Sequence, residues 1–310
     1  MTIFIFAGEP SGDLHGSHLA GALKKQLNYK IEGVAGPLMR KSGVHTFMEM
    51  EEFAVMGFTD VFLSLPSLIR KFYKVLGYIL TLNPKDVILI DYPGFNLRLA
   101  SHLRKKGYQG KIIQYICPTV WAWGKKRIEI MSQTLDLLLT IYPFEKNYFS
   151  HTSLAVEYVG HPITKTVQQH TYAPFHVDKK NELVALFPGS RKAEIKRNFP
   201  KILQALHLFK QKVPNVIFGI SIASETTKNL LEEILSTSQI KEKDYFFISK
   251  ERTYELMQQC KTAIAKSGTV TLELALHEKP TVVGYELSFL NRFIAKYIMR
   301  IKLPFYCIVN

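Results

Sequence analysis

The first residues suited to chemistry follow the apolar strand pattern TIFIF at the start of the chain. There the turn Gly8–Asp13 (GEPSGD) leads into a helical pattern. Unpaired N–H groups and the helix dipole favour an anion at such a junction, so Ser11, Gly12 and Asp13 are candidate substrate contacts. Glu9 adds an acid that suits sugar hydroxyls or proton transfer. A well-capped first turn of any doubly wound fold would show the same residues, and that interpretation stays open.

A second junction of the same kind adds a cation to the glycine turn. After the strand pattern LVALF, the residues Pro188, Gly189, Ser190 and Arg191 precede a long helical pattern. The planar guanidinium of Arg191 can form paired hydrogen bonds with a diphosphate, and Gly189 and Ser190 are candidate contacts of the same anion. Two phosphate-type turns in different halves of the chain predict two similar α/β domains.

A third helix start follows the strand pattern TAIA in the second half of the chain. Ser267, Gly268 and Thr269 form its first turn, where an anion can accept hydrogen bonds from the backbone. Glu273 lies one helical turn after Thr269, so both side chains share a face of the helix, and a carboxylate there suits ribose hydroxyls. The alternative for Glu273 is an ordinary glutamate on a helix surface.

A lone carboxylate follows the apolar strand pattern VILI. Asp91 comes directly after it, with Tyr92, Pro93 and Gly94 in a turn and Asn96 as a candidate helix cap. A carboxylate at the carboxyl end of a buried strand suits a general base that accepts a proton from an attacking hydroxyl. A capping or loop-stabilising role for Asp91 is the alternative.

Strand and helix patterns alternate along both halves of the chain, which predicts parallel sheets covered by helices on both faces. The expected strands are Thr2–Phe6, Ile31–Val34, Val87–Ile90, Lys111–Ile116, Leu137–Thr140, Leu183–Phe187, Val216–Ile220, Tyr245–Ile248, Thr262–Ala265 and Thr281–Tyr285. The expected helices are Gly12–Leu27, Pro66–Thr81, Asn96–Lys106, Lys125–Gln133, Lys192–Lys212, Glu225–Leu235, Thr253–Cys260 and Thr269–Leu276.

These patterns predict the fold class α/β, with two Rossmann-like domains in tandem. The polar segment 161–181 interrupts the alternation, so we expect an N-terminal domain over residues 1–165 and a C-terminal domain over residues 166–310. Ligands of such sheets bind beyond the carboxyl ends of the strands. The sequence therefore predicts two domains that face each other across a ligand-binding cleft.

The composition favours anionic partners. The chain has 310 residues, 47% of them hydrophobic, and a formal net charge of +14, which suits phosphorylated substrates or an anionic membrane. We expect no nucleic-acid partner, because the basic residues form short scattered clusters without a nucleic-acid-binding motif. Cys117, Cys260 and Cys307 are far apart and lack histidines at metal-ligand spacing. This pattern predicts buried free thiols, a cytosolic compartment and no metal site.

Two segments combine apolar and basic residues. Ser64–Leu82 reads SLPSLIRKFYKVLGYILTL, and Leu287–Phe305 is similar. Such helices can be buried in a protein core, or they can bind in an anionic membrane interface. No uncharged apolar run reaches the roughly 18 residues that a membrane span needs, and we expect no signal peptide.

Several motifs together resemble one enzyme family. The segments AGEPSGD, DYPGFN, PTVWAWGKKR, VGHP, LFPGSRKAEI and KSGTVTLE occur in order and at compatible spacing over nearly the whole chain. They are similar to the motifs of lipid-A-disaccharide synthase, an inverting glycosyltransferase. The combination is far more specific than any one glycine-rich turn.

The resemblance implies a glycosyltransferase-B fold and a reaction between two acylated sugars. A 2,3-diacylglucosamine unit would pass from UDP-2,3-diacylglucosamine to 2,3-diacylglucosamine 1-phosphate (lipid X), which gives lipid A disaccharide 1-phosphate and UDP. No cofactor or metal is implied. We expect the protein to bind peripherally at the cytoplasmic face of the inner membrane, through the segment Ser64–Leu82.

The family's functional residues fall on positions already singled out. The resemblance places the catalytic aspartate at Asp91, the arginine of the PGSR motif at Arg191 and the glutamate of the first turn at Glu9. The serine–glycine–threonine turn coincides with residues 267–269, and the glutamate that follows it coincides with Glu273.

The chain departs from the family's pattern in two places. Gly94 stands where many members carry a second aspartate, so Asp91 would act without that neighbour. Asn310 matches a site asparagine, and the sequence ends there, so we expect the family's C-terminal segment to be missing. Two other interpretations stay open. One is another UDP-sugar enzyme of the same fold, such as an epimerase or a transferase with a soluble acceptor, and the other is a non-catalytic lipid- or nucleotide-binding module.

Overall fold

The computed structural model divides the chain into two compact units, Met1–Pro162 and Ile163–Asn310. The boundary falls in helix α6 (Pro162–Gln168), a helix that the sequence analysis did not expect. We describe unit 1 and unit 2 separately. The structure describes residues 1–26, 29–53, 58–121, 124, 126–178, 180–288, 292, 297 and 307, and for residues 58–64 it describes the backbone alone.

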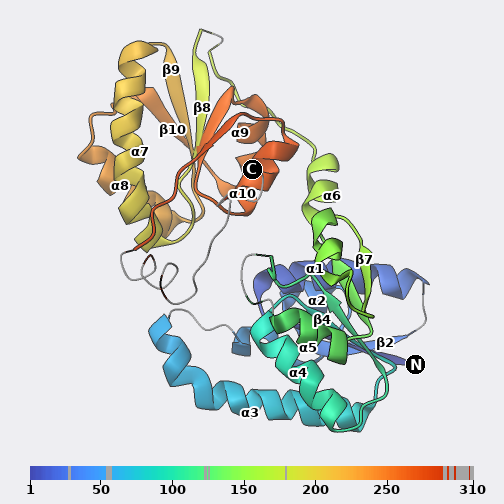
Figure 1. Ribbon diagram of the computed structural model, residues 1–310. Coiled ribbons are helices and arrows are strands. Elements are labelled where there is room, and N and C mark those ends of the chain that lie inside the picture. Colours follow the sequence, from blue (N-terminus) through green and yellow to red (C-terminus); the bar gives the residue numbers. More distant parts are fainter. Residues whose placement is uncertain are drawn as a thin grey trace. The chain divides into compact units, whose positions relative to one another are not determined.

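Unit 1, the blue-to-green part of the chain in Figure 1, is built on a seven-stranded parallel sheet. The strand order is β3-β2-β1-β4-β5-β6-β7. The strands are β1 (Thr2–Ala7), β2 (Lys30–Ala35), β3 (His45–Glu49), β4 (Asp86–Ile90), β5 (Lys111–Tyr115), β6 (Leu137–Thr140) and β7 (Ala155–Tyr158). The five central strands were predicted from the sequence, but the two edge strands, β3 and β7, were not. An edge strand is only partly buried, so HTFME and AVEY lack the continuous apolar run that marks a central parallel strand.

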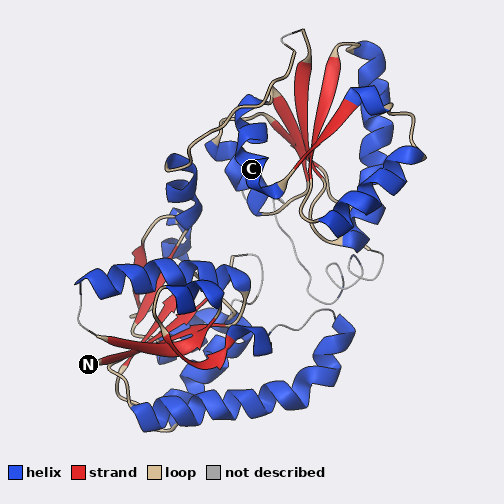
Figure 2. Cartoon of the chain, turned by 180° about the vertical axis from the view of Figure 1, so that it is seen from behind, coloured by secondary structure: helices blue, strands red, loops and turns tan. Residues whose placement is uncertain are grey.

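Helices cover both faces of this sheet (Figure 2). They are α1 (Pro10–Gln26), α2 (Pro37–Lys41), α3 (Phe58–Leu82), α4 (Pro93–Lys105) and α5 (Lys126–Thr134), with 3-10 turns at Met50–Phe53 and Pro143–Phe149. Strand β1 shows why two layers are needed. Phe4 and Phe6 are buried in a cluster with α3, α4 and α5, whereas Ile3 and Ile5 are buried in a cluster with α1 and α2. Side chains alternate along a strand, so an all-apolar strand requires a hydrophobic layer on each side.

Unit 2 contains a five-stranded parallel sheet in the order β10-β9-β8-β11-β12. Its strands are β8 (Glu182–Phe187), β9 (Val216–Ser221), β10 (Tyr245–Ile248), β11 (Thr262–Ala265) and β12 (Thr281–Val283). Its helices include α7 (Lys192–Lys212), α8 (Glu225–Ser236), α9 (Thr253–Gln259) and α10 (Thr269–Leu276), and 3-10 turns lie at Glu242–Asp244 and Lys250–Arg252. The sequence predicted each of these strands and α-helices, although β12 ends at Val283 and not at Tyr285.

The core of unit 2 follows the same alternation. Val184 and Leu186 of β8 are buried with residues of α7 and α8. Leu183 and Ala185 are buried on the other side, with residues of α9 and α10. Both units are therefore doubly wound sheets, and their loops at the carboxyl ends of the strands are the positions at which such folds bind ligands.

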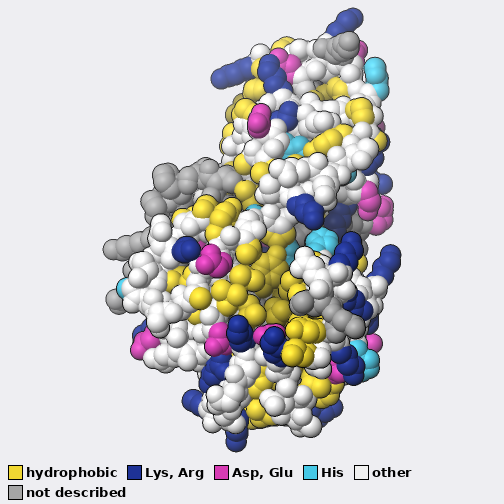
Figure 3. Space-filling model, turned by 90° about the vertical axis from the view of Figure 1, so that its right-hand side faces the viewer, with side chains coloured by type: hydrophobic (Ala, Val, Ile, Leu, Met, Phe, Trp, Pro, Cys, Tyr) yellow, Lys and Arg dark blue, Asp and Glu magenta, His cyan; other side chains and the backbone are white. Residues whose placement is uncertain are grey.

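Basic side chains are scattered over the face of the molecule shown in Figure 3 and form no single stripe there. Some of the basic side chains of the protein pair with acids: Lys201 lies 2.6 Å from Glu286, and Lys261 lies 2.8 Å from Glu182. Among the described residues, none of the helices combines the length and the apolar composition that a membrane span requires.

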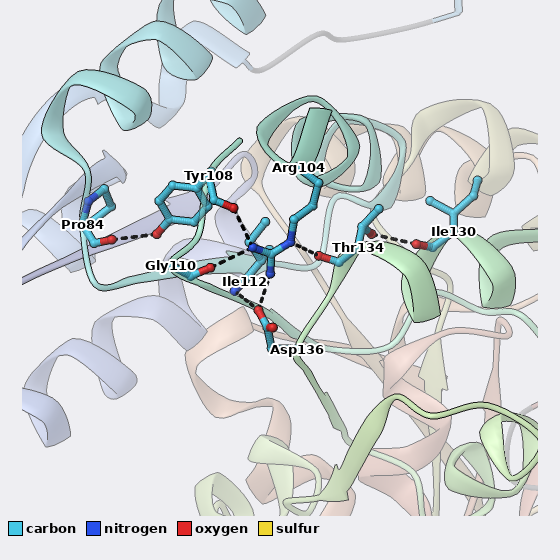
Figure 4. Close-up of polar contacts among 8 residues, drawn as sticks. All are labelled: Pro84, Arg104, Tyr108, Gly110, Ile112, Ile130, Thr134 and Asp136. Carbon is cyan, nitrogen blue, oxygen red and sulfur yellow. Dashed lines mark hydrogen bonds and ion pairs between the residues drawn. The ribbon is translucent and has the colours of Figure 1, made fainter. Parts of the chain in front are cut away.

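A polar network lies at the amino ends of strands β5 and β6 in unit 1, away from the carboxyl ends at which such sheets bind ligands (Figure 4). The guanidinium of Arg104, on α4, donates to the carbonyl oxygens of Tyr108, Gly110 and Thr134 at 2.9, 3.0 and 3.1 Å. It also forms an ion pair with Asp136, which precedes β6. One side chain thus satisfies three carbonyl groups that lie outside the strand ladder, and it joins α4 to the loops before β5 and β6.

We predict that Arg104→Met lowers the free energy of unfolding of unit 1 by about 2–3 kcal/mol, because several carbonyls and Asp136 lose a charged partner. Both tryptophans of the chain, at positions 121 and 123, belong to unit 1, so tryptophan fluorescence during urea unfolding reports this unit. Arg98→Met is the matched control, because Arg98 is an exposed residue of the same helix. Equal loss of stability in the two variants would contradict the prediction.

Candidate active site

In unit 1 the strand order changes direction between β1 and β4, and two candidate carboxyls follow these strands. The strands are neighbours, with Ala7 paired to Ile90 at their carboxyl ends. On one side of this pair β2 lies beside β1, and on the other side β5 lies beside β4. Glu9 lies two residues after β1, and Asp91 directly follows β4. The topology therefore brings Glu9 and Asp91 to the switch point, where doubly wound sheets bind their ligands.

The backbone at Asp91 adopts a conformation that residues other than glycine rarely take. Asp91 has a φ of 47° and Tyr92 a φ of 43°, and each such residue costs on the order of 1–3 kcal/mol unless its surroundings hold it. Gly8, in the neighbouring turn, makes room for this geometry, because a Cβ there would lie 2.8 Å from Cδ1 of Tyr92. Contacts with the rest of the unit must therefore fix the turn after β4.

Two buried amides supply these contacts. Nδ2 of Asn96 donates to the carbonyl oxygens of Ile90 and Asp91 at 3.2 and 2.6 Å. Nε2 of Gln114, on β5, donates to the same Asp91 carbonyl at 3.0 Å. The sequence predicted Asn96 as a helix cap, and that prediction was wrong. Tyr92 is the N-cap residue of α4, so Asn96 lies inside the first turn and its amide reaches back past the cap.

Burial and a neighbouring acid adjust the proton affinity of Asp91. Burial raises the pKa of the Asp91 carboxyl to about 7, and the charge and the hydrogen bond of Glu9 add to the shift. The charged form is disfavoured both by loss of water and by repulsion from a second carboxylate. A carboxyl whose pKa lies near the working pH is an effective general base, so Asp91 has the proton affinity that the sequence-based hypothesis requires.

The other candidates in the first turn occupy different environments. Ser11 is exposed in the first turn of α1, and Gly12 is buried. Asp13 is 2% exposed, and its two carboxylate oxygens accept the N–H groups of Leu38 and Met39, each at 2.9 Å. The structure thus gives Asp13 the role of holding the start of α2, and we leave it out of the proposed substrate contacts.

Unit 2 repeats the topology with cations in place of the carboxyl pair. Its strand order changes direction between β8 and β11, which are paired through Phe187 and Ala265. The PGSR turn follows β8, and Gly189 in that turn has a φ of 96°, which favours glycine. Lys266 follows β11 and donates its N–H to the carbonyl oxygen of Phe187 at 3.1 Å. The ends of the two strands therefore place the PGSR turn beside Lys266.

A buried carboxylate links Arg191 and Lys266, the two cations at the switch point of unit 2. We call the candidate residues at the switch point of each unit a half-site. Ser190 and Arg191 are exposed just before α7. Nη1 of Arg191 lies 3.1 Å from Oε1 of Glu194, and Nζ of Lys266 lies 2.8 Å from Oε2. Burial acts to raise the pKa of Glu194, but the hydrogen bonds and charges of Lys266 and Arg191 outweigh it, so the pKa lies below its usual value. Glu194 therefore stays charged between the two cations.

Helix α10 contributes the remaining candidates of unit 2. Gly268 is the N-cap residue, Ser267 precedes it and Thr269 is the first helical residue. Glu273 lies one turn further, and burial raises its pKa. The hydroxyl of Tyr254, on α9, donates to Oε1 of Glu273 at 3.0 Å. Tyr254 thus holds one oxygen of the carboxyl group, an arrangement that suits recognition of hydroxyl groups by the other oxygen.

The sequence analysis missed most of the residues that support the candidate groups. Gln114, Glu194 and Tyr254 reach their partners across the fold or along a helix, and nothing in their local sequence marks them. Lys266 did carry a signal, because it is a cation directly after a buried strand, next to a helix start. Asn310, which the sequence singled out, lies outside the described residues.

In the part of the chain that the structure describes, no three His, Cys, Asp or Glu side chains are arranged to hold a metal ion. The three cysteines are buried free thiols, as the sequence predicted. Burial raises the pKa of Cys260 to about 11, so this thiol is protonated at neutral pH and is a poor metal ligand.

Comparison with known proteins assigns the chain to a family. A family model described as lipid-A-disaccharide synthetase matches residues 3–310. The chain belongs to the lipid-A-disaccharide synthase family. Relatives within it include the lipid-A-disaccharide synthases of Chlamydia pneumoniae, 40% identical over 312 residues, and of Geobacter sulfurreducens, 35% identical over 306 residues. The resemblance read from the motifs is therefore confirmed.

The chain spans about half the length of the chlamydial lipid-A-disaccharide synthases that it matches. The alignment covers 99% of this chain and 51% of the C. pneumoniae protein, and it covers 96% of this chain and 78% of the G. sulfurreducens protein. The family match therefore covers nearly the whole chain. The activity of the longer relatives is proposed for this chain below.

Solved structures support the predicted fold class. A putative UDP-N-acetylglucosamine 2-epimerase from Listeria monocytogenes superimposes with a TM-score of 0.64 over 91% of this chain and 78% of that protein, at 10% identity. At this identity the similarity shows the fold alone. It confirms the α/β fold with two Rossmann-like domains of glycosyltransferase-B type that the lipid-A-disaccharide synthase resemblance implied.

We predict that Glu9→Gln lowers the pKa of Asp91, because the substitution removes the neighbouring negative charge that disfavours ionisation. The pKa is measured by carbon-13 NMR of the aspartate carboxyl groups as the pH is varied. Glu49→Gln is the matched control, since Glu49 is an exposed acid at the end of β3. An Asp91 pKa that stays near 7 in the Glu9→Gln variant would show that Glu9 does not contribute.

Proposed function

We propose that the protein is an inverting glycosyltransferase that joins two acylated glucosamine units. The donor is UDP-2,3-diacylglucosamine and the acceptor is lipid X, and the products are lipid A disaccharide 1-phosphate and UDP. The observation that carries the proposal is the Asp91 carboxyl, which has a pKa of about 7 at the switch point of a chain that belongs to this family. Family membership supplies the reaction, and the carboxyl supplies the group that the reaction needs.

In the proposed reaction Asp91 acts on the acceptor. Its ionised carboxylate takes the proton of the 6-hydroxyl while the oxygen attacks the anomeric carbon of the donor from the face opposite to UDP. The new C–O bond forms as the bond to the diphosphate breaks, so the configuration inverts and UDP leaves with the bonding electron pair. Glu9 raises the proton affinity of Asp91 through its charge and hydrogen bond, which strengthens the base at neutral pH.

Unit 2 would bind the donor. Arg191 is exposed and cationic, and it would stabilise the negative charge that grows on the departing diphosphate. Gly189 and Ser190 belong to the same turn, and Ser267–Thr269 lies at the start of α10. Glu273, with one oxygen held by Tyr254, would accept hydrogen bonds from the ribose hydroxyls of UDP.

The two halves of helix α3 suggest two different roles. Val75, Leu76 and Ile79 are buried in the core of unit 1, so this part of the helix has the structural role that the sequence left open. Nearer the start of the helix, Leu65, Ile69 and Tyr73 are 44, 49 and 59% exposed. A spacing of four residues places these three side chains along one face of the helix.

This exposed face has the character of a membrane-binding surface. Arg70 and Lys74 are exposed beside Ile69 and Tyr73, and apolar side chains flanked by cations bind favourably at an anionic lipid interface. Both proposed substrates carry acyl chains, so an enzyme that acts on them needs access to the membrane. We therefore place the protein, as part of this proposal, at the cytoplasmic face of the inner membrane as a peripheral protein.

The proposed reaction is tested by mixing the chain with UDP-2,3-diacylglucosamine and lipid X in detergent micelles and following UDP release. We expect release only when both substrates are present, and a rate that rises with pH through about 7, because the base must lose its proton. Asp91→Asn should reduce turnover by about 100- to 10,000-fold, the range that general base catalysis typically contributes, while UDP binding persists.

Asp86→Asn is the matched control for this assay, because Asp86 begins the strand that Asp91 follows. It should leave turnover within about twofold of the unmodified chain. Full turnover by Asp91→Asn would remove Asp91 as the base. Formation of an epimer from UDP-N-acetylglucosamine, or nucleotide binding without any transfer, would instead favour one of the two interpretations that the sequence left open.

We predict that replacing both Ile69 and Tyr73 by serine weakens binding to anionic phospholipid vesicles about tenfold or more, because the change removes two of the three large apolar side chains that are exposed on the described part of α3. Co-sedimentation with vesicles of phosphatidylglycerol and phosphatidylethanolamine measures the effect. Leu208→Ser is the control, since Leu208 is 60% exposed on α7. Equal binding by all three proteins would show that α3 is not the contact.

A further inference from the structure

Lys266 lies at the place where the two phosphate-type turns of unit 2 meet. It follows β11, and its N–H is bonded to the carbonyl oxygen of Phe187, the last residue of β8. A Cβ built on Gly189 would lie 3.6 Å from Cδ of Lys266, so the aliphatic part of the lysine runs beside the PGSR turn. The ammonium group is therefore held within the candidate diphosphate site, and its side chain is only 20% exposed.

The charges around Lys266 do not balance. Glu194 is the carboxylate shared by Lys266 and Arg191, at 2.8 and 3.1 Å, so two cations face one anion. Nζ of Lys266 also lies 5.2 Å from the centre of the Tyr285 ring, a contact that favours a cation but adds no negative charge. The cluster therefore has one positive charge in excess, and a second anion would be attracted to it.

The geometry of Glu194 makes it a replaceable counterion. The side chain of Arg191 is 77% exposed, whereas the carboxylate is largely buried. Arg191 can therefore turn toward a ligand, while Glu194 stays where the start of α7 holds it. A diphosphate carries at least two negative charges on several oxygens, so it can engage both cations where Glu194 offers each of them a single oxygen.

We propose that Lys266 is a second ligand of the donor diphosphate, and that Glu194 holds Lys266 and Arg191 in place until the nucleotide arrives. This inference rests on the proposed function, because it takes a UDP-sugar as the ligand of unit 2. When UDP binds, the phosphate oxygens replace Glu194 as the hydrogen-bond partner of both cations. Lys266 then shares with Arg191 the charge that develops on the leaving group.

The inference is tested by titrating UDP and uridine into the 310-residue chain and into the Lys266→Met variant, with isothermal calorimetry. We expect the variant to bind UDP about tenfold more weakly and uridine as well as the unmodified chain does, because only the diphosphate would contact Lys266. A role in folding alone would weaken both ligands or neither. Lys266→Arg keeps the charge, and it should bind UDP within about threefold of the unmodified chain.

Strand β11 offers a matched control at its other end. Lys261 precedes β11 and pairs with Glu182 at 2.8 Å, the same separation as that between Lys266 and Glu194. Lys261→Met should leave the binding of both ligands unchanged. Glu194→Gln removes the competing charge, so it should bind UDP more tightly than the unmodified chain, and weaker binding would overturn the counterion role.

The outcomes separate this inference from the function on which it rests. If the unmodified chain binds UDP and Lys266→Met binds it equally well, the inference is wrong and the proposed function stands. If the unmodified chain binds no UDP while remaining folded by circular dichroism, the proposed donor site fails, and the inference fails with it.

Discussion

The hydrogen bonds from Asn96 and Gln114 to the carbonyl oxygen of Asp91 are the constraint on which the unit 1 half-site depends. They hold two consecutive residues in a left-handed conformation that neither Asp91 nor Tyr92 would adopt by preference. The amides come from α4 and β5, so the turn forms only when the helix and the neighbouring strand are both in place. These bonds fix the backbone from which the Asp91 carboxyl projects, and a general base requires a fixed position.

The same topology serves opposite electrostatic needs in the two units. Each half-site lies where the strand order of its sheet changes direction, between β1 and β4 or between β8 and β11. In unit 1 two acids share this point, and their repulsion together with burial keeps the pKa of Asp91 high. In unit 2 two cations share one acid, which leaves an excess of positive charge. A proton acceptor needs the first arrangement, and an anionic leaving group needs the second.

The Arg104 network and the candidate catalytic carboxyls lie at opposite ends of the unit 1 strands. At the amino ends Arg104 donates to three carbonyl groups and pairs with one carboxylate. At the carboxyl ends the turn after β4 is strained, and burial together with the charge of Glu9 raises the pKa of Asp91. Proteins commonly store strain at functional sites and compensate for it elsewhere, and this division within one sheet follows that rule.

Residue order alone was sufficient to predict the fold class, the central strands of both sheets and the turns that carry Asp91 and Arg191. Those features depend on continuous apolar runs and on local glycine and helix-start signals, which are visible within a few residues. The edge strands β3 and β7 were not predicted, because they are only partly buried and have no continuous apolar run.

The contacts that fix the charge and the geometry of the half-sites could be identified only in the folded structure. Asp13 has the sequence context of a ligand residue, yet it holds the start of α2, and Gln114 reaches the Asp91 carbonyl from a different strand. Glu194 joins Arg191, three positions earlier, to Lys266, more than seventy positions later. A partner so distant in sequence becomes a neighbour only when the sheet pairs β8 with β11, because pairing depends on the packing of the whole domain and not on local preference.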